Sequence, residues 1–206
     1  MYYFDYFYLM LHCLFASLSD VKTKAKISQD INVFAKGYHI TSIIEDANND
    51  LNYKSLRIIL RKCPEYRNIF YARIGKLTHK YHLSKILEVI LKPYPLLFIG
   101  IPADRIGGGL YIEHGNSTII HAKQIGDFCW INQNVTIGDS GRGIPTIRDY
   151  VKIHTGAVVL GPITVGENSI IGANATIVKD VPADSVVVPA ASYIVKRNGI
   201  RVNEKL

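Results

Sequence analysis

A branched aliphatic residue recurs every six residues in the second half of the chain, and this spacing constrains the fold more than any other feature. The positions are Ile125, Ile131, Ile137, Ile147, Ile153, Val159, Val165, Ile171 and Ile177, with one longer interval after Ile137. A helix would need a spacing of about 3.6 residues and an amphipathic strand a spacing of about 2. One inward side chain per six residues is instead typical of a parallel β-helix, whose rungs bury their apolar residues only by stacking on one another.

Two segments break the six-residue period. Residues 113–118 read Glu-His-Gly-Asn-Ser-Thr, and residues 139–146 form a longer excursion that contains two glycines. Inserted residues in a repeat array must project from the stack, where they are free to carry function. We therefore expect functional side chains at these two interruptions.

The composition divides the chain into two main regions. Residues 1–98 carry apolar positions at helical spacing, for example Leu56, Ile59 and Leu60, and are predicted to form a helical domain. Residues 99–195 are predicted to form the β-helix with its excursion loop, and 196–206 a C-terminal tail. The expected fold class is thus α+β, and the 48% hydrophobic, 20% charged composition excludes a disordered chain.

The formal net charge of +7 favours anionic partners, such as the phosphates of a cofactor. Many basic residues lie among helical apolar positions before residue 98, so they belong either to solvated helix faces or to a surface that contacts a membrane. A nucleic-acid partner is not expected, because no aromatic and basic surface motif accompanies the charge.

The three cysteines, Cys13, Cys63 and Cys129, are isolated from one another and from histidine pairs. This pattern indicates neither a disulfide framework nor a metal site, and it favours the cytoplasm. The aromatic run at residues 1–17 is too short to span a membrane; it is expected either to pack in the protein or to lie at the inner membrane face.

Several motifs of the second region resemble those of the hexapeptide-repeat acyltransferases, within them the serine acetyltransferase-like branch. They are Ile-Pro-Ala-x-x-Ile-Gly-x-Gly at 101–109, Glu113-His114, and Ile-Gly-Ala-Asn-Ala-Thr-Ile-Val-Lys-Asp-Val-Pro at 171–182. The resemblance implies a left-handed β-helix and a homotrimer or a dimer of trimers. It also implies acetyl-CoA as co-substrate, bound between neighbouring columns, and no metal.

His114 is the candidate general base, because it matches the catalytic histidine of these enzymes. Acetyl transfer from a thioester to an alcohol needs a group that removes the hydroxyl proton near neutral pH, and imidazole is suited to this. Glu113 is its candidate partner, either fixing the imidazole or accepting a hydrogen bond from the acceptor.

The chain departs from the serine acetyltransferase pattern at two places. Ile99 stands where the resemblance implies an orienting aspartate, and Gly143-Ile144-Pro145 stands for Arg-His-Pro in the excursion. An amino-acid carboxylate without a charged partner would bind poorly, and the Gly-Ile-Pro-x-Ile form resembles acetyltransferases of surface polysaccharides. We therefore predict an O-acetyltransferase acting on a sugar of capsular or exopolysaccharide synthesis. Serine O-acetyltransferase and an inactive trimeric scaffold are the alternatives.

The remaining candidate residues surround these two interruptions. Asn132, Gln133, Arg142 and His154 are predicted to bind the acceptor, His154 at a position where relatives have glycine. Small or cationic residues are predicted to hold acetyl-CoA, and these are Gly156, Ala157, Gly161, Ala173, Ala175, Lys179, Lys196 and Arg197.

Overall fold

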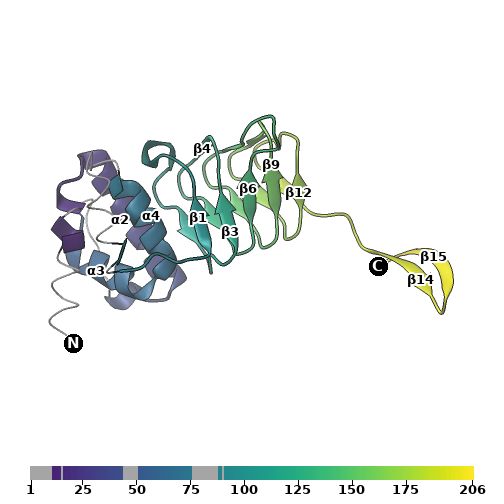
Figure 1. The fold of residues 1–206 in the computed structure, drawn as a ribbon, viewed down its shortest axis with the longest axis horizontal. Helices are drawn as coiled ribbons and strands as arrows, with labels where there is room; N and C mark the ends of the chain where they lie inside the picture. Colours follow the sequence, from purple (N-terminus) through teal and green to yellow (C-terminus); the bar gives the residue numbers. More distant parts are fainter. Residues whose placement is uncertain (1–10, 15, 44–50, 76–87, 90) are drawn as a thin grey trace.

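The computed structural model describes residues 11–14, 16–43, 51–75, 88–89 and 91–206. Most of the aromatic run at the N-terminus lies outside these residues. Helices sit at one end of a long stack of short strands, and a separate hairpin projects from the other end (Figure 1). Among the described helices, none is long and apolar enough to cross a membrane.

The predicted helical region is confirmed over the part of it that the structure describes. It contains the α-helices α2 (Val21–Gly37), α3 (Tyr53–Lys62) and α4 (Pro64–Ile74), and the 3-10 helix η1 (Thr41–Ile43). Each α-helix begins where the sequence favours a start. Asp20 accepts from the Thr23 amide at 2.7 Å, Asn52 accepts from the Lys54 and Ser55 amides at 3.0 Å, and Pro64 opens α4.

A buried ion pair fixes these helices to the first rung of the stack. Arg73 of α4 donates from Nε to Asp30 of α2 at 2.5 Å, and both side chains are almost fully buried. Arg73 also donates to the carbonyl oxygens of Ile106 (3.2 Å) and Gly107 (2.6 Å), while Asp30 accepts from the Gly109 amide at 2.8 Å. The pair thereby satisfies main-chain groups of the rung that no neighbouring strand reaches.

The stack is a left-handed parallel β-helix with three faces, as predicted. The first face contains β1 (Leu97–Ile99), β3 (Thr118–Ile120), β6 (Thr136–Gly138), β9 (Val158–Leu160) and β12 (Thr176–Ile177). The second face contains β4 (Gln124–Ile125), β7 (Thr146–Ile147) and β10 (Thr164–Val165). The third face contains β2 (Tyr111–Ile112), β5 (Trp130–Ile131), β8 (Lys152–Ile153), β11 (Ile170–Ile171) and β13 (Val186–Val187). A short 3-10 helix, η3 (Ala103–Arg105), lies between β1 and β2.

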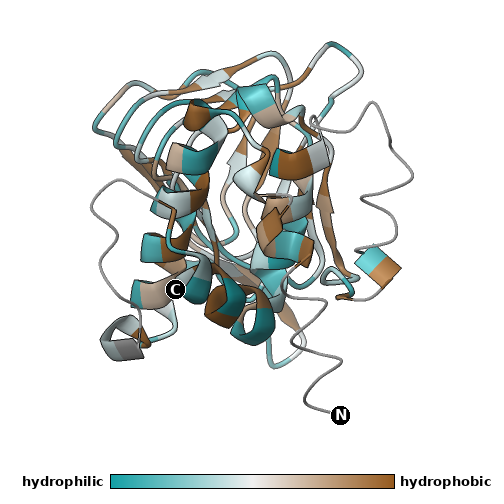
Figure 2. Ribbon diagram, turned by 90° about the vertical axis from the view of Figure 1, so that its left-hand side faces the viewer, coloured by the Kyte–Doolittle hydropathy of each residue, from teal (hydrophilic) through white to brown (hydrophobic). Residues whose placement is uncertain are grey.

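The six-residue column is buried as predicted: all nine positions from Ile125 to Ile177 are at most 6% exposed. Figure 2 shows the stack end-on behind the helices, with hydrophobic residues along the strands. At the first interruption the inward residue is Ile120, which is fully buried, whereas Ile119 is 47% exposed. The interval from Ile112 to the next inward residue, Ile120, is therefore two residues longer than the interval from Ile131 to Ile137. The extra residues belong to the turn that carries His114.

The C-terminal segment forms an antiparallel hairpin of β14 (Tyr193–Arg197) and β15 (Ile200–Lys205). It stands apart from the stack at the end of an extended connection (Figure 1).

Candidate active site

His114 lies on the tight turn between the third and first faces, directly after β2. Its backbone φ is +61°, a value that non-glycine residues seldom adopt, and its side chain is exposed. The turn is closed by a hydrogen bond from the Asn116 amide to the His114 carbonyl oxygen. Such left-handed backbone is common in the turns of this stack, so the repeat itself supplies the geometry that presents the imidazole to solvent.

Behind this turn lies a carboxylate of the helical region that the sequence did not suggest. Glu65 of α4 is 5% exposed, and it accepts a hydrogen bond from the Tyr38 hydroxyl at 2.6 Å. A Cβ atom at Gly115 would come within 2.9 Å of the Glu65 Cγ atom. Glycine is therefore needed next to His114 so that α4 can pack against the turn.

Glu113, Asn132 and His154 occupy the same position on three successive rungs of the third face. Their amides donate to Ile131, Ile153 and Ile171 of the following rung at 2.9 to 3.0 Å, which fixes the register. Asn132 Nδ2 donates to Glu113 Oε2, and His154 Nδ1 lies 3.0 Å from Asn132 Oδ1. The structure thus brings three of the predicted site residues into one hydrogen-bonded column, which we call the polar column.

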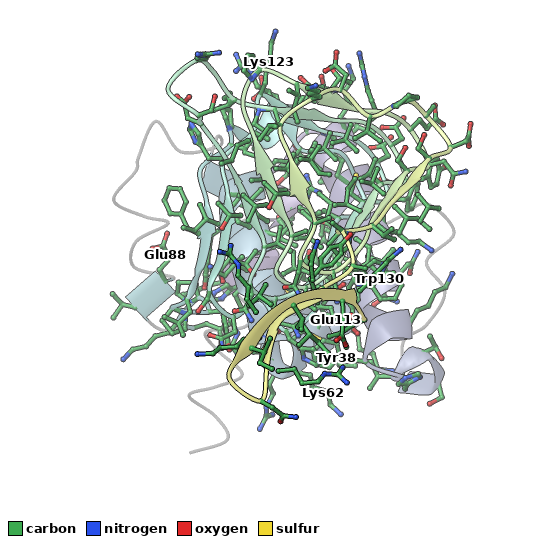
Figure 3. The ribbon with its side chains drawn as sticks, turned by 90° about the vertical axis from the view of Figure 1, so that its right-hand side faces the viewer. Tyr38, Lys62, Glu88, Glu113, Lys123 and Trp130 are labelled. Atoms are coloured by element: carbon green, nitrogen blue, oxygen red, sulfur yellow. The ribbon has the colours of Figure 1, made fainter. Side chains whose placement is uncertain are left out.

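Trp130 completes the environment of Glu113, and sequence reasoning missed it. Its indole Nε1 donates to Glu113 Oε2 at 3.2 Å, and Figure 3 shows the two side chains side by side. The ring also packs edge-on against Tyr111 at 5.5 Å, and the Lys152 ammonium lies 5.8 Å from its centroid. Tyr111, Trp130 and Lys152 share one register position, one residue before the buried isoleucines, whereas Glu113 and Asn132 follow them. Counting from the isoleucines would have placed Trp130 opposite Tyr111, on the same outer side of the rung as Glu113.

A cavity of about 400 Å³ opens between the end of α2 and the first two rungs. Its walls are Val33, Lys36, Gly37, His39, Gly109, Tyr111, Glu113, Phe128, Cys129 and Trp130. Burial, followed by the nearby Glu113 carboxylate, raises the pKa of Tyr111 to about 12, so this phenol stays protonated. Glu113 thus shares this cavity with apolar and aromatic side chains and with the cationic side chain of Lys36.

Gln133 and Arg142, both predicted to bind the acceptor, lie outside the polar column. Gln133 is half-buried, and its Oε1 atom is fully buried with no hydrogen-bond partner among the described residues. Arg142 is exposed on the excursion loop, which folds around Asp139 through bonds from the Gly141 (2.7 Å) and Gly143 (3.0 Å) amides. The loop joins the first face to the second, whereas the polar column ends the third face.

The residues predicted to hold acetyl-CoA fall into three groups. Gly156, Ala157, Ala173 and Ala175 lie on the turns between the third and first faces, the corner that also carries His114. Gly161 follows β9, and a Cβ there would lie 3.1 Å from Ser140 Oγ of the excursion. Lys179 is exposed on the last rung, while Lys196 and Arg197 lie on the projecting hairpin, where Arg197 pairs with Glu204. The structure brings the first group beside the His114 turn and does not bring the hairpin residues there.

Cys129 is 1% exposed within a rung. Burial is the main reason that its pKa is raised to about 12, so the thiol is neutral and packed. Within the described part of the chain, no cluster of three His, Cys, Asp or Glu side chains could hold a metal ion.

Comparison with known proteins identifies the class of this chain. The family described as bacterial transferase hexapeptide (six repeats) matches residues 144–179. A serine acetyltransferase of Bacillus subtilis is 37% identical over 149 residues, which cover 67% of each protein. The chain belongs to the hexapeptide-repeat transferase family.

Two further relatives indicate the branch. The serine acetyltransferase of Synechococcus elongatus is 41% identical over 148 residues, which cover 68% of this chain but only 60% of that protein. The structure of Neisseria gonorrhoeae serine acetyltransferase in complex with serine superposes with a TM-score of 0.60 at 25% identity, over 85% of this chain and 70% of the other. The predicted serine acetyltransferase-like class and the predicted acetyl-CoA-dependent enzyme class agree with these relatives.

The predicted sugar acceptor is wrong, because the relatives at 37 to 41% identity are serine acetyltransferases. That prediction depended on Ile99, which ends β1, and on two uncharged residues of the excursion, Gly143 and Ile144. The excursion residues lie on a loop outside the polar column, and so they do not exclude an amino-acid acceptor.

Proposed function

We propose that this chain is a serine O-acetyltransferase, which moves the acetyl group of acetyl-CoA to the serine side-chain hydroxyl. The observation that carries the proposal is an exposed imidazole on a left-handed turn, His114, which directly follows Glu113, a carboxylate held by two donors. The identity of the chain to serine acetyltransferases supports the choice of acceptor.

The chemistry needs no covalent enzyme intermediate. His114 takes the proton of the serine hydroxyl as its oxygen attacks the thioester carbonyl carbon. The tetrahedral oxyanion then collapses with cleavage of the C–S bond, and the imidazolium returns the proton to the leaving thiolate. Glu113, which is held as a hydrogen-bond acceptor, suits the ammonium group of the serine.

We also propose that the chain acts as a trimer, with acetyl-CoA lying along the corner that carries His114. The first face, which adjoins that corner, exposes apolar side chains in register: Phe98 is 58% exposed and pairs with Ile119, which is 47% exposed. Contact with a neighbouring copy would remove these side chains from water. The small residues Gly156 and Ala173 leave room at this corner for a pantetheine chain.

The experiment is a measurement of free CoA thiol released from acetyl-CoA with serine, alanine or glucose as acceptor, and with no acceptor. Of the three acceptors, we expect only serine to raise the rate of thiol release above the acceptor-free rate. We also expect mass spectrometry to detect O-acetylserine. Alanine is the matched control because it lacks only the hydroxyl. Release with glucose but not serine, or with no acceptor at all, would contradict the proposal. Light scattering of the same sample tests the trimer.

A further inference from the structure

The Glu113 carboxylate is held from one side only. Trp130 Nε1 and Asn132 Nδ2 both donate to the same atom, Oε2. None of the described residues donates to Oε1. A carboxylate accepts about four hydrogen bonds, so Oε1 retains its capacity for a ligand. The same side chain lines the 400 Å³ cavity.

The orientation of the Asn132 amide decides whether this arrangement holds. Its oxygen can only accept, so the atom that faces it at 3.0 Å, His154 Nδ1, must carry a proton. This bond turns the amide nitrogen toward Glu113. The opposite orientation would place the amide oxygen against the carboxylate, where two acceptors repel each other.

His154 is the last side chain of the polar column. The next residue in register is Gly172, whose amide donates to Val187 O at 2.7 Å. Glycine offers no side chain to replace the imidazole. The half-buried His154 is therefore the group that fixes the orientation of Asn132.

We propose that His154 and Asn132 are positioning residues that act through Glu113. His154 Nδ1–H holds Asn132 Oδ1, Asn132 Nδ2–H holds Glu113 Oε2, and Glu113 Oε1 is thereby aimed at the ammonium group of the acceptor. The inference depends on the proposed function, since it assigns the acceptor to Glu113. Loss of the His154 imidazole should weaken the binding of the acceptor without changing the binding of acetyl-CoA.

The test measures kcat and KM for serine and for acetyl-CoA in the full-length trimer. In His154→Leu we expect the serine KM to rise roughly tenfold, the change expected when one hydrogen bond that positions Asn132 is lost, with an unchanged acetyl-CoA KM. His154→Asn should restore the serine KM to within about twofold, because the amide Nδ2 takes the place of Nδ1–H. His121→Leu is the matched control: His121 is exposed and lies 3.1 Å from the Gly100 carbonyl oxygen, outside the column.

A double variant separates a relay from two independent contacts. Asn132→Leu alone should raise the serine KM at least as much as His154→Leu, and the double variant should match Asn132→Leu. Three results would overturn the relay while leaving the proposed function intact. The serine KM of the double variant could rise by the product of the two single increases, or the serine KM of His154→Leu could stay unchanged. The third such result is an equal rise of the serine KM in His154→Asn and His154→Leu. A wild-type protein that does not acetylate serine would overturn both.

Discussion

The helical region and the β-helix are stabilised in different ways. Every rung of the β-helix repeats the same apolar contact, so that Ile131, Ile153 and Ile171 make equivalent contributions to the core. The helices are joined to the first rung by contacts that occur once, above all the Asp30–Arg73 pair with its bonds to Ile106 and Gly107. Repeated contacts tolerate local loss, whereas a unique buried charge pair has no substitute.

The largest effect is expected for Arg73→Met. This change leaves the Asp30 carboxylate buried without its cation and the Gly107 carbonyl oxygen without its side-chain donor, at a cost of about 4 kcal/mol. The Ile106 carbonyl oxygen keeps a donor, because Lys26 Nζ lies 2.5 Å from it. Urea unfolding measures this cost, and Arg73→Met combined with Asp30→Leu should recover part of the loss. A loss below about 1 kcal/mol in Arg73→Met would remove the distinction between the two regions.

A somewhat smaller loss is expected for Ile153→Ala in the apolar column. Ile153 is fully buried, and the truncation should cost about 3 kcal/mol through the lost contacts and the cavity that remains. Val186→Ala, on the same face but 68% exposed, is the control and should change stability by less than about 0.5 kcal/mol. Similar losses for the two variants would contradict the assignment of the inward column.

The turns of the β-helix should respond to backbone conformation alone. Asn134 has a φ of +58° and an exposed side chain, so Asn134→Ala should lose about 1 kcal/mol, because Cβ disfavours this conformation. Asn134→Gly, which removes the Cβ restriction, should be close to neutral in the same unfolding measurement. A larger loss for glycine than for alanine would show that the strain argument is wrong.

The smallest effect is expected for the alkylation of two cysteine thiols, one from each region. Burial is the first cause that raises the pKa of both Cys63 in the helical region and Cys129 in the β-helix to about 12. Below that pH both remain protonated thiols, so neither should react with iodoacetamide at pH 8 in the native protein. Mass spectrometry of the alkylated protein measures this, and rapid native labelling of Cys129 would contradict its place inside a rung.

The difference between repeated contacts in the β-helix and unique contacts in the helical region also explains how much of the fold the sequence could predict. The six-residue period from Ile125 onward determines the inward positions directly, and the turn at His114 appears as a longer interval before it, between Ile112 and Ile120. The sequence predicted the members of the polar column as site residues but not their contacts with one another. Their common register becomes clear only after Ile112, Ile131 and Ile153 are aligned. The contacts of Asp30 with Arg73 and of Glu65 with Gly115 join segments far apart in the chain, and no local pattern indicates them.

The variant His114→Asn shows whether the turn after β2 carries the general base. Asparagine tolerates the left-handed backbone at φ +61° but cannot take the proton, so the fold should be preserved. We expect kcat/KM for serine to fall at least about 100-fold in this variant, while the free energy of unfolding changes by less than about 0.5 kcal/mol. If this variant acetylates serine at the wild-type rate, His114 is not the general base.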